Sequence, residues 1–77
     1  MDRLETVLNR TAAALEQTAR LADRHAARHA AAGKADSAAA ERRAAGQARE
    51  AAQRARDNAA KRARLVANGF GGPPIGP

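Results

Sequence analysis

The sequence predicts an all-α protein: an antiparallel hairpin of two helices that is expected to complete a bundle by oligomerisation. Three observations support this. Of the 34 hydrophobic residues, 24 are Ala, which is the strongest helix former. Apolar residues recur at steps of three and four residues, which is the helical period. Residues that stop and start helices cluster once before the C-terminal region, at Gly33, Asp36 and Ser37.

The first helix is expected over residues 3–32. Asp2 and Glu5 have the spacing of a capping box, in which each satisfies a backbone N–H of the other. One face of the helix is apolar, whereas Glu16 and Asp23 are predicted to point away from it, with Arg10, Arg20 and Arg24. The apolar face comprises Leu4, Leu8, Ala12, Leu15, Ala19, Ala22, Ala26 and Ala30, and it is flanked by Val7, Ala14 and Leu21.

A turn is expected at residues 33–36. Gly33 is suited to the left-handed conformation that ends many helices, and Asp36 or Ser37 is suited to cap the next helix. The alternative is one long continuous helix, because a single Gly costs only about 1 kcal/mol. The hairpin is favoured because it brings the apolar residues near position 65 back beside those near position 4.

The second helix is expected over residues 37–67. It has a stripe of small residues, with cations predicted on the opposite side. The helix–helix contact, of coiled-coil type, is predicted to use large residues near the open end and Ala elsewhere. These interface residues are Leu4, Val7, Leu8, Leu15, Ala19, Ala22, Ala48, Ala52, Ala55, Ala59, Leu65 and Val66. So thin a core in a chain of 77 residues favours a homo-oligomer.

The formal net charge of +6 is unevenly distributed along the chain. Residues 1–41 are balanced, and residues 42–64 carry the whole excess. A basic helix face can follow phosphates, bind an acidic protein, or simply remain solvated. A membrane-lying helix would oppose its charges with large apolar residues, and this one opposes them with Ala. The predicted basic face comprises Arg42, Arg43, Arg49, Arg54, Arg56, Lys61, Arg62 and Arg64.

Residues 1–68 form the predicted helical hairpin, and residues 69–77 form an extended tail rich in Gly and Pro. The helix is predicted to end near Asn68, with Phe70 reaching back to Leu65 as in a Schellman motif. Beyond it, the sequence favours an extended conformation. Phe70 and Ile75 are the candidate anchors for docking on a protein partner, and a frayed terminus is the alternative.

Catalysis and cofactors are not expected. The chain has no Cys, and its Thr and Ser residues lack a base suited to activate them. His25 and His29 have a spacing that two metal ligands can use, but no third ligand accompanies them. We therefore expect no metal, no cofactor and no small-molecule substrate. With neither a signal peptide nor a membrane span evident, a cytoplasmic location is expected.

Two functions remain as hypotheses at this stage. The first is a non-enzymatic assembly or adaptor protein that acts through self-association and protein–protein contacts. The second is a sequence-nonspecific nucleic-acid binder that uses the basic residues between positions 42 and 64. Against the second, the chain has no Trp or Tyr and a single Phe, so it has little with which to stack bases.

Overall fold

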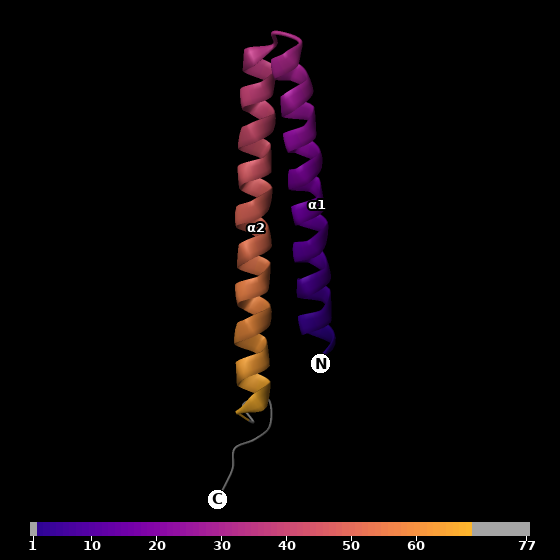
Figure 1. The fold of residues 1–77 in the computed structure, drawn as a ribbon. Helices are drawn as coiled ribbons and strands as arrows, with labels where there is room; N and C mark the ends of the chain where they lie inside the picture. The colour runs from indigo at the N-terminus through magenta and orange to yellow at the C-terminus, as the bar shows by residue number, and fades with distance from the viewer. Residues whose placement is uncertain (1, 69–77) are drawn as a thin grey trace, which may run out of the picture.

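The chain folds into a hairpin of two long antiparallel helices, seen here in a computed structural model that describes residues 2–68. Helix α1 spans Arg3–Ala31 and helix α2 spans Ala35–Ala67. The helices lie side by side along their length, and the start of α1 and the end of α2 lie at the same end (Figure 1). The predicted hairpin is therefore confirmed over the continuous helix.

Helix α1 begins with the hydrogen bond that Asp2 accepts in the predicted capping box, and it ends at the predicted glycine. The Asp2 carboxylate accepts a hydrogen bond of 3.0 Å from the Glu5 N–H. At the other end, Gly33 has a φ of +76°. The Gly33 N–H donates to Ala30 O, and the Lys34 N–H donates to His29 O at 2.8 Å. This pair of bonds is a Schellman motif, which occupies carbonyls that the helix end leaves unpaired.

Helix α2 begins two residues earlier than predicted, and neither Asp36 nor Ser37 is its N-cap. Lys34 holds that position, without a side-chain capping bond. The reason is the shortness of the connection: the Schellman motif finishes at Lys34, whose carbonyl already accepts from the Ala38 N–H at 3.0 Å. Asp36 consequently lies in the first turn of α2, where a carboxylate interacts favourably with the helix dipole.

The core between the helices contains only Ala. No large side chain and no polar or charged side chain is fully buried among the described residues. Leu15 is partly buried, against a cluster made by Ala12, Ala52 and Ala55. Because each buried side chain is a single methyl group, the two backbones can approach closely. The buried residues are Ala12, Ala19, Ala22 and Ala26 of α1, and Ala38, Ala45, Ala48, Ala52, Ala55 and Ala59 of α2.

The two described glycines predict opposite effects of the same substitution. Gly33→Ala should destabilise the fold by about 1–2 kcal/mol, because a side chain disfavours positive φ. Gly46→Ala should stabilise it by up to about 1 kcal/mol, because Gly46 lies inside α2 with nothing within 4 Å of an added Cβ. Urea unfolding followed by circular dichroism measures both. Equal effects of the two substitutions would contradict the left-handed turn.

Candidate interaction surface

The helix pair has two unlike edges, one on each side of the Ala core. At the first, which we call the charged edge, arginines of α2 reach carboxylates of α1. The Arg56 guanidinium donates to the Glu16 carboxylate at 2.6 Å, and Arg49 pairs with Asp23 in the same way. All four side chains are partly exposed. Pairs this exposed contribute about 0.2–1 kcal/mol each to the stability of the fold. Their main effect is to favour one alignment of the two helices over others.

The charged edge differs from the sequence prediction. Glu16 and Asp23 were expected to point away from α2, and Arg49 and Arg56 to lie opposite the Ala stripe. Each instead comes one residue after a buried or partly buried residue, which places it about 100° around the helix from the core. From these positions the long Arg side chains of α2 reach the carboxylates of α1. The spacing itself indicates the contact, since the two acids are seven residues apart and so are the two arginines.

Asp2 connects the start of α1 to the C-terminal part of α2. The Arg62 guanidinium donates to its carboxylate at 2.8 Å, while the same carboxylate caps α1. The backbone N–H of Glu5 and then the Arg62 guanidinium lower the pKa of Asp2, because both stabilise its ionised form. The Asp2 side chain thus caps the N-terminus of α1 and also binds Arg62 near the C-terminal end of α2.

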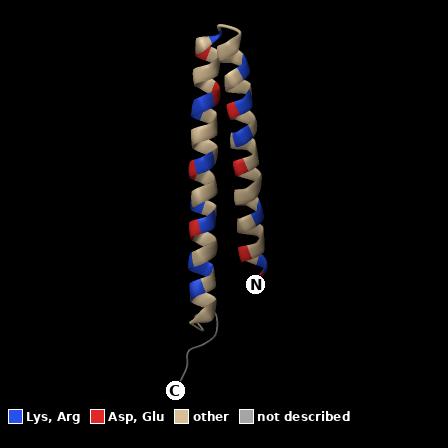
Figure 2. Ribbon diagram, in the orientation of Figure 1, with Lys and Arg blue, Asp and Glu red and all other residues tan. Residues whose placement is uncertain are grey.

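These ion pairs redistribute the charge excess. Three arginines of the predicted basic face, at positions 49, 56 and 62, are paired with carboxylates of α1 or its cap. Five cations against two carboxylates then remain in residues 42–64, and six against three remain in residues 2–41. Counted by helix, five cations against one carboxylate remain on α1 and five against four remain on α2, with Lys34 between them, so the excess lies mainly on α1 (Figure 2). The remaining five cations of the face are exposed: Arg42, Arg43, Arg54, Lys61 and Arg64.

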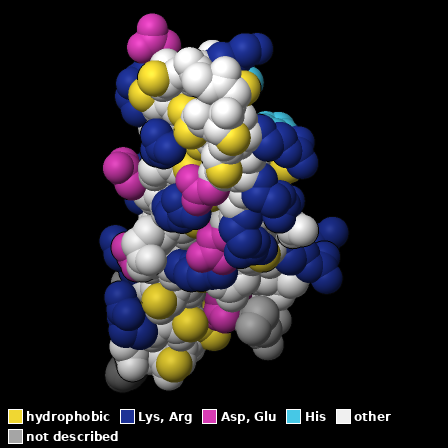
Figure 3. All heavy atoms as spheres, turned by 45° about the horizontal axis from the view of Figure 1, so that its top comes forward, with side chains coloured by type: hydrophobic (Ala, Val, Ile, Leu, Met, Phe, Trp, Pro, Cys, Tyr) yellow, Lys and Arg dark blue, Asp and Glu magenta, His cyan; other side chains and the backbone are white. Residues whose placement is uncertain are grey.

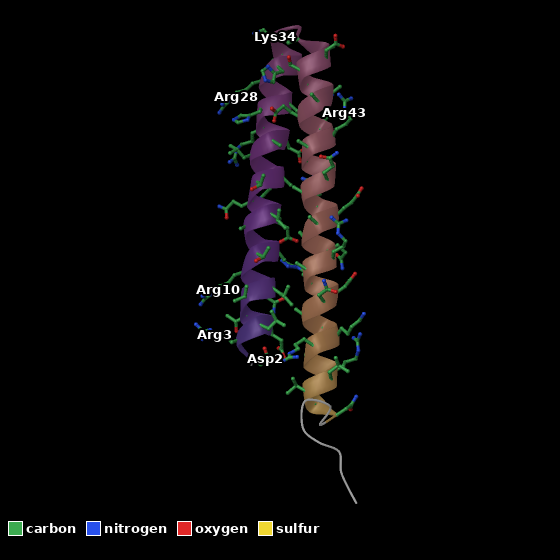
Figure 4. All side chains as sticks on the ribbon, turned by 180° about the vertical axis from the view of Figure 1, so that it is seen from behind. Asp2, Arg3, Arg10, Arg28, Lys34 and Arg43 are labelled. Atoms are coloured by element: carbon green, nitrogen blue, oxygen red, sulfur yellow. The ribbon has the colours of Figure 1, made fainter. Side chains whose placement is uncertain are left out.

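The outer sides of the two helices carry much of this unpaired positive charge. Arg3, Arg10 and Arg28 point away from α2, and Arg43 points away from α1 (Figure 4). Basic side chains also surround the exposed hydrophobic ones on one face of the molecule (Figure 3). The predicted basic face of α2 is thus one part of a cationic exterior.

The second edge, which we call the apolar edge, is formed on α1 by the residues that come just before a buried Ala or a partly buried Leu. None of them is Asp, Glu, Lys or Arg. Val7 is 50% exposed and Leu21 is 45% exposed. At the open end, this edge is hollowed by a space of about 440 Å³ whose lining includes Leu4, Val7 and Arg62. The α1 residues of the apolar edge are Val7, Thr11, Ala14, Thr18, Leu21 and His25.

The predicted helix–helix interface divides by side-chain size. Its small members are buried, namely Ala19, Ala22, Ala48, Ala52, Ala55 and Ala59, whereas Leu8, Leu15 and Leu65 are partly buried. Leu4, Val7 and Val66 are about half exposed. The large apolar side chains therefore lie around the core and not within it. The predicted tail anchors Phe70 and Ile75 lie outside the described residues.

The two histidines lie towards the turn, and both are partly exposed. His25 Nδ1 is 3.8 Å from a Glu41 carboxylate oxygen. Within residues 2–68, no group of three or more His, Asp or Glu side chains gathers as a metal site would require.

Comparison of the chain with protein-family models, curated proteins and solved structures finds no match. Of the helices that the structure describes, neither has a stretch long and apolar enough to cross a bilayer.

The position of Asp2 predicts a pH-dependent contribution to stability. Because folding lowers its pKa, the stabilisation is present above the usual Asp value of about 4 and is lost as the pH falls through the folded value. Asp2→Asn keeps a capping oxygen but has no charge. We expect wild type to melt at a higher temperature than this variant at about pH 7, and the gap to shrink as the pH falls below about 4 and through the lowered pKa of Asp2.

Arg62→Gln serves as the control, since it removes the ion pair and leaves the cap. It should retain part of the pH dependence, because the Glu5 N–H is the larger cause of the lowered pKa. Thermal melts followed by circular dichroism test this. A gap between wild type and Asp2→Asn that stays constant with pH would contradict the assignment.

Proposed function

We propose that this protein is a non-enzymatic helical assembly or adaptor protein, acting through self-association and contacts with other proteins. One observation carries the proposal. Among residues 2–68, the fully buried side chains are all Ala, while four larger apolar side chains are 45–50% exposed. Those four are Leu4, Val7, Leu21 and Val66.

A protein of this size has little apolar surface to bury within a single chain. Removing apolar surface from water is the main favourable contribution to folding, and a methyl group contributes little of it. Proteins of this size commonly gain further stability from disulfides, metals or oligomerisation. The chain has no Cys, and residues 2–68 contain no group of three or more side chains that could hold a metal ion. Association that covers the half-exposed side chains supplies the missing apolar contacts.

The charge pattern supports contacts with other proteins as well as with copies of the chain. The ion pairs use the charged edge within the hairpin, and the outer sides of both helices keep unpaired cations. Such a surface is suited to an acidic protein partner. In this proposal the apolar edge serves self-association, and the cationic exterior serves the second partner.

Molar mass in solution tests the proposal. Analytical ultracentrifugation over a wide concentration range should show a mass at a multiple of the 8.0 kDa chain. The melting temperature should rise with protein concentration, because association stabilises only the folded state. A single-chain mass at every concentration, together with a concentration-independent melting temperature, would overturn the proposal.

A second candidate function is nonspecific binding of nucleic acid, favoured by the cations that remain unpaired on both outer sides. Phosphate contacts of this kind weaken steeply as salt rises from about 50 to 200 mM. The measurement is a fluorescence titration of labelled DNA and RNA over that range. Arg43→Gln should weaken binding and reduce its salt dependence, whereas Arg56→Gln should have less effect because Arg56 is held by Glu16. No binding at the lowest salt would eliminate this function.

A further inference from the structure

We propose that two copies of the chain associate through the apolar edge of α1, with the two α1 helices antiparallel and a two-fold axis passing beside Ala14. The inference rests on the proposed function, and it adds the surface and the register. Val7 of each copy lies against Leu21 of the other, and the two Ala14 side chains face each other. The product is a four-helix bundle of two hairpins.

The location of the apolar edge points to a helix as its occupant. Its residues lie one position before those that face α2, which places them roughly a quarter-turn around α1. A helix in the corner of a four-helix bundle contacts two neighbours at about that angle. α1 therefore has one face for α2 and, between positions 7 and 25, a second face for another helix that includes no Asp, Glu, Lys or Arg, with Arg28 following in the same row seven residues after Leu21.

The sequence of the edge points to a second copy of the same helix. From position 7 to position 21 the order of residues is large, Thr, Ala, Thr, large, and it is the same in reverse, with Thr11 three residues and Thr18 four residues from Ala14. Val7 and Leu21 are each seven residues from Ala14, or about 10 Å along the helix. An interface with a two-fold axis requires a surface that is complementary to itself. The small residue at the axis lets the helices approach, and the large ones pack on either side.

Charge selects the antiparallel over the parallel arrangement. Arg3, Arg10 and Arg28 lie on the outer side of α1, away from α2 (Figure 4). In a parallel pair, each of these arginines would lie beside the same arginine of the second chain, and like charges at the same level repel. In the antiparallel pair centred on Ala14, Arg10 is level with Thr18 of the second copy. The helix dipoles also oppose each other in this arrangement.

The neighbouring edge of α2 is compatible with the same bundle. The α2 residues that come just before buried Ala are mostly small or neutral, with Arg54 as the one charged member. Its long side chain lies at the surface and is exposed, so its charge can remain in water. The others are Ser37, Ala44, Gln47, Ala51 and Asn58.

Ala14→Glu tests the surface, and Ala13→Glu is its matched control. Both positions are exposed on α1, and both changes are the same, so their effects on helix propensity are alike. Ala13 lies on the other side of the helix from the apolar edge. We expect Ala14→Glu to raise the dimer dissociation constant at least ten-fold and Ala13→Glu to change it less than three-fold, as measured by ultracentrifugation. Circular dichroism checks that both remain helical.

Cysteine cross-linking tests the register, because the chain has no Cys of its own. Under mild oxidation, Ala14→Cys should form a disulfide-linked dimer by itself. Val7→Cys alone should not, because its two copies would be about 20 Å apart. An equal mixture of Val7→Cys and Leu21→Cys should yield the mixed dimer. Efficient self-linking of Val7→Cys would instead indicate parallel helices and would overturn the proposed register.

The outcomes separate this inference from the proposed function. A wild-type chain that is monomeric at every concentration overturns both. A wild-type oligomer that Ala14→Glu leaves intact overturns only the surface proposed here and leaves self-association standing. A dimer lost with Ala14→Glu, kept with Ala13→Glu and cross-linked through Ala14→Cys supports both.

Discussion

The close contact of two Ala-lined helix faces is the constraint on which the rest of this molecule depends. Ala is the strongest helix former and loses no rotamer entropy on burial, so it provides long helices and a narrow seam between them. The same choice leaves no room in the seam for Leu or Val. The larger apolar side chains consequently lie around the core, where Leu4, Val7 and Leu21 are about half exposed. A surface suited to association is thus a by-product of how the hairpin itself is packed.

The narrow seam also determines what its charged residues do. With the helices close together, a Glu or Asp just beyond the core of one helix lies within reach of an Arg just beyond the core of the other. Three of the eight cations between positions 42 and 64 are used in this way or in contact with Asp2. A charge excess that lies in residues 42–64 of the sequence is found mainly on α1 once these ion pairs are counted. The net charge of a sequence segment therefore does not give the charge that the same segment exposes in the folded protein.

Much of the fold follows from local sequence properties. The period of the apolar residues predicts both helices, and the left-handed conformation of Gly33 follows from its missing Cβ. The start of α2 does not follow so directly, because the hydrogen bonds that finish α1 leave no space for a separate cap at Asp36. Which cations remain free also depends on the partner helix, since Arg49 and Arg56 are paired because Asp23 and Glu16 of α1 lie across the charged edge from them. Glu16 and Asp23 are seven residues apart, as Arg49 and Arg56 are, and this shared spacing is a feature of the sequence that indicates the pairing.

An interface of identical methyl groups has a further consequence for alignment. The buried Ala12, Ala19 and Ala26 are seven residues apart on α1, as Ala45, Ala52 and Ala59 are on α2. Sliding one helix by seven residues, about 10 Å, would again set Ala against Ala, and it would bring Glu16 level with Arg49. The contact surface alone distinguishes poorly between these alignments. Three residues, with Gly33 among them, connect the helices. A connection this short cannot span the extra distance of about 10 Å in a shifted alignment, so it restricts the chain to one of several nearly equivalent alignments.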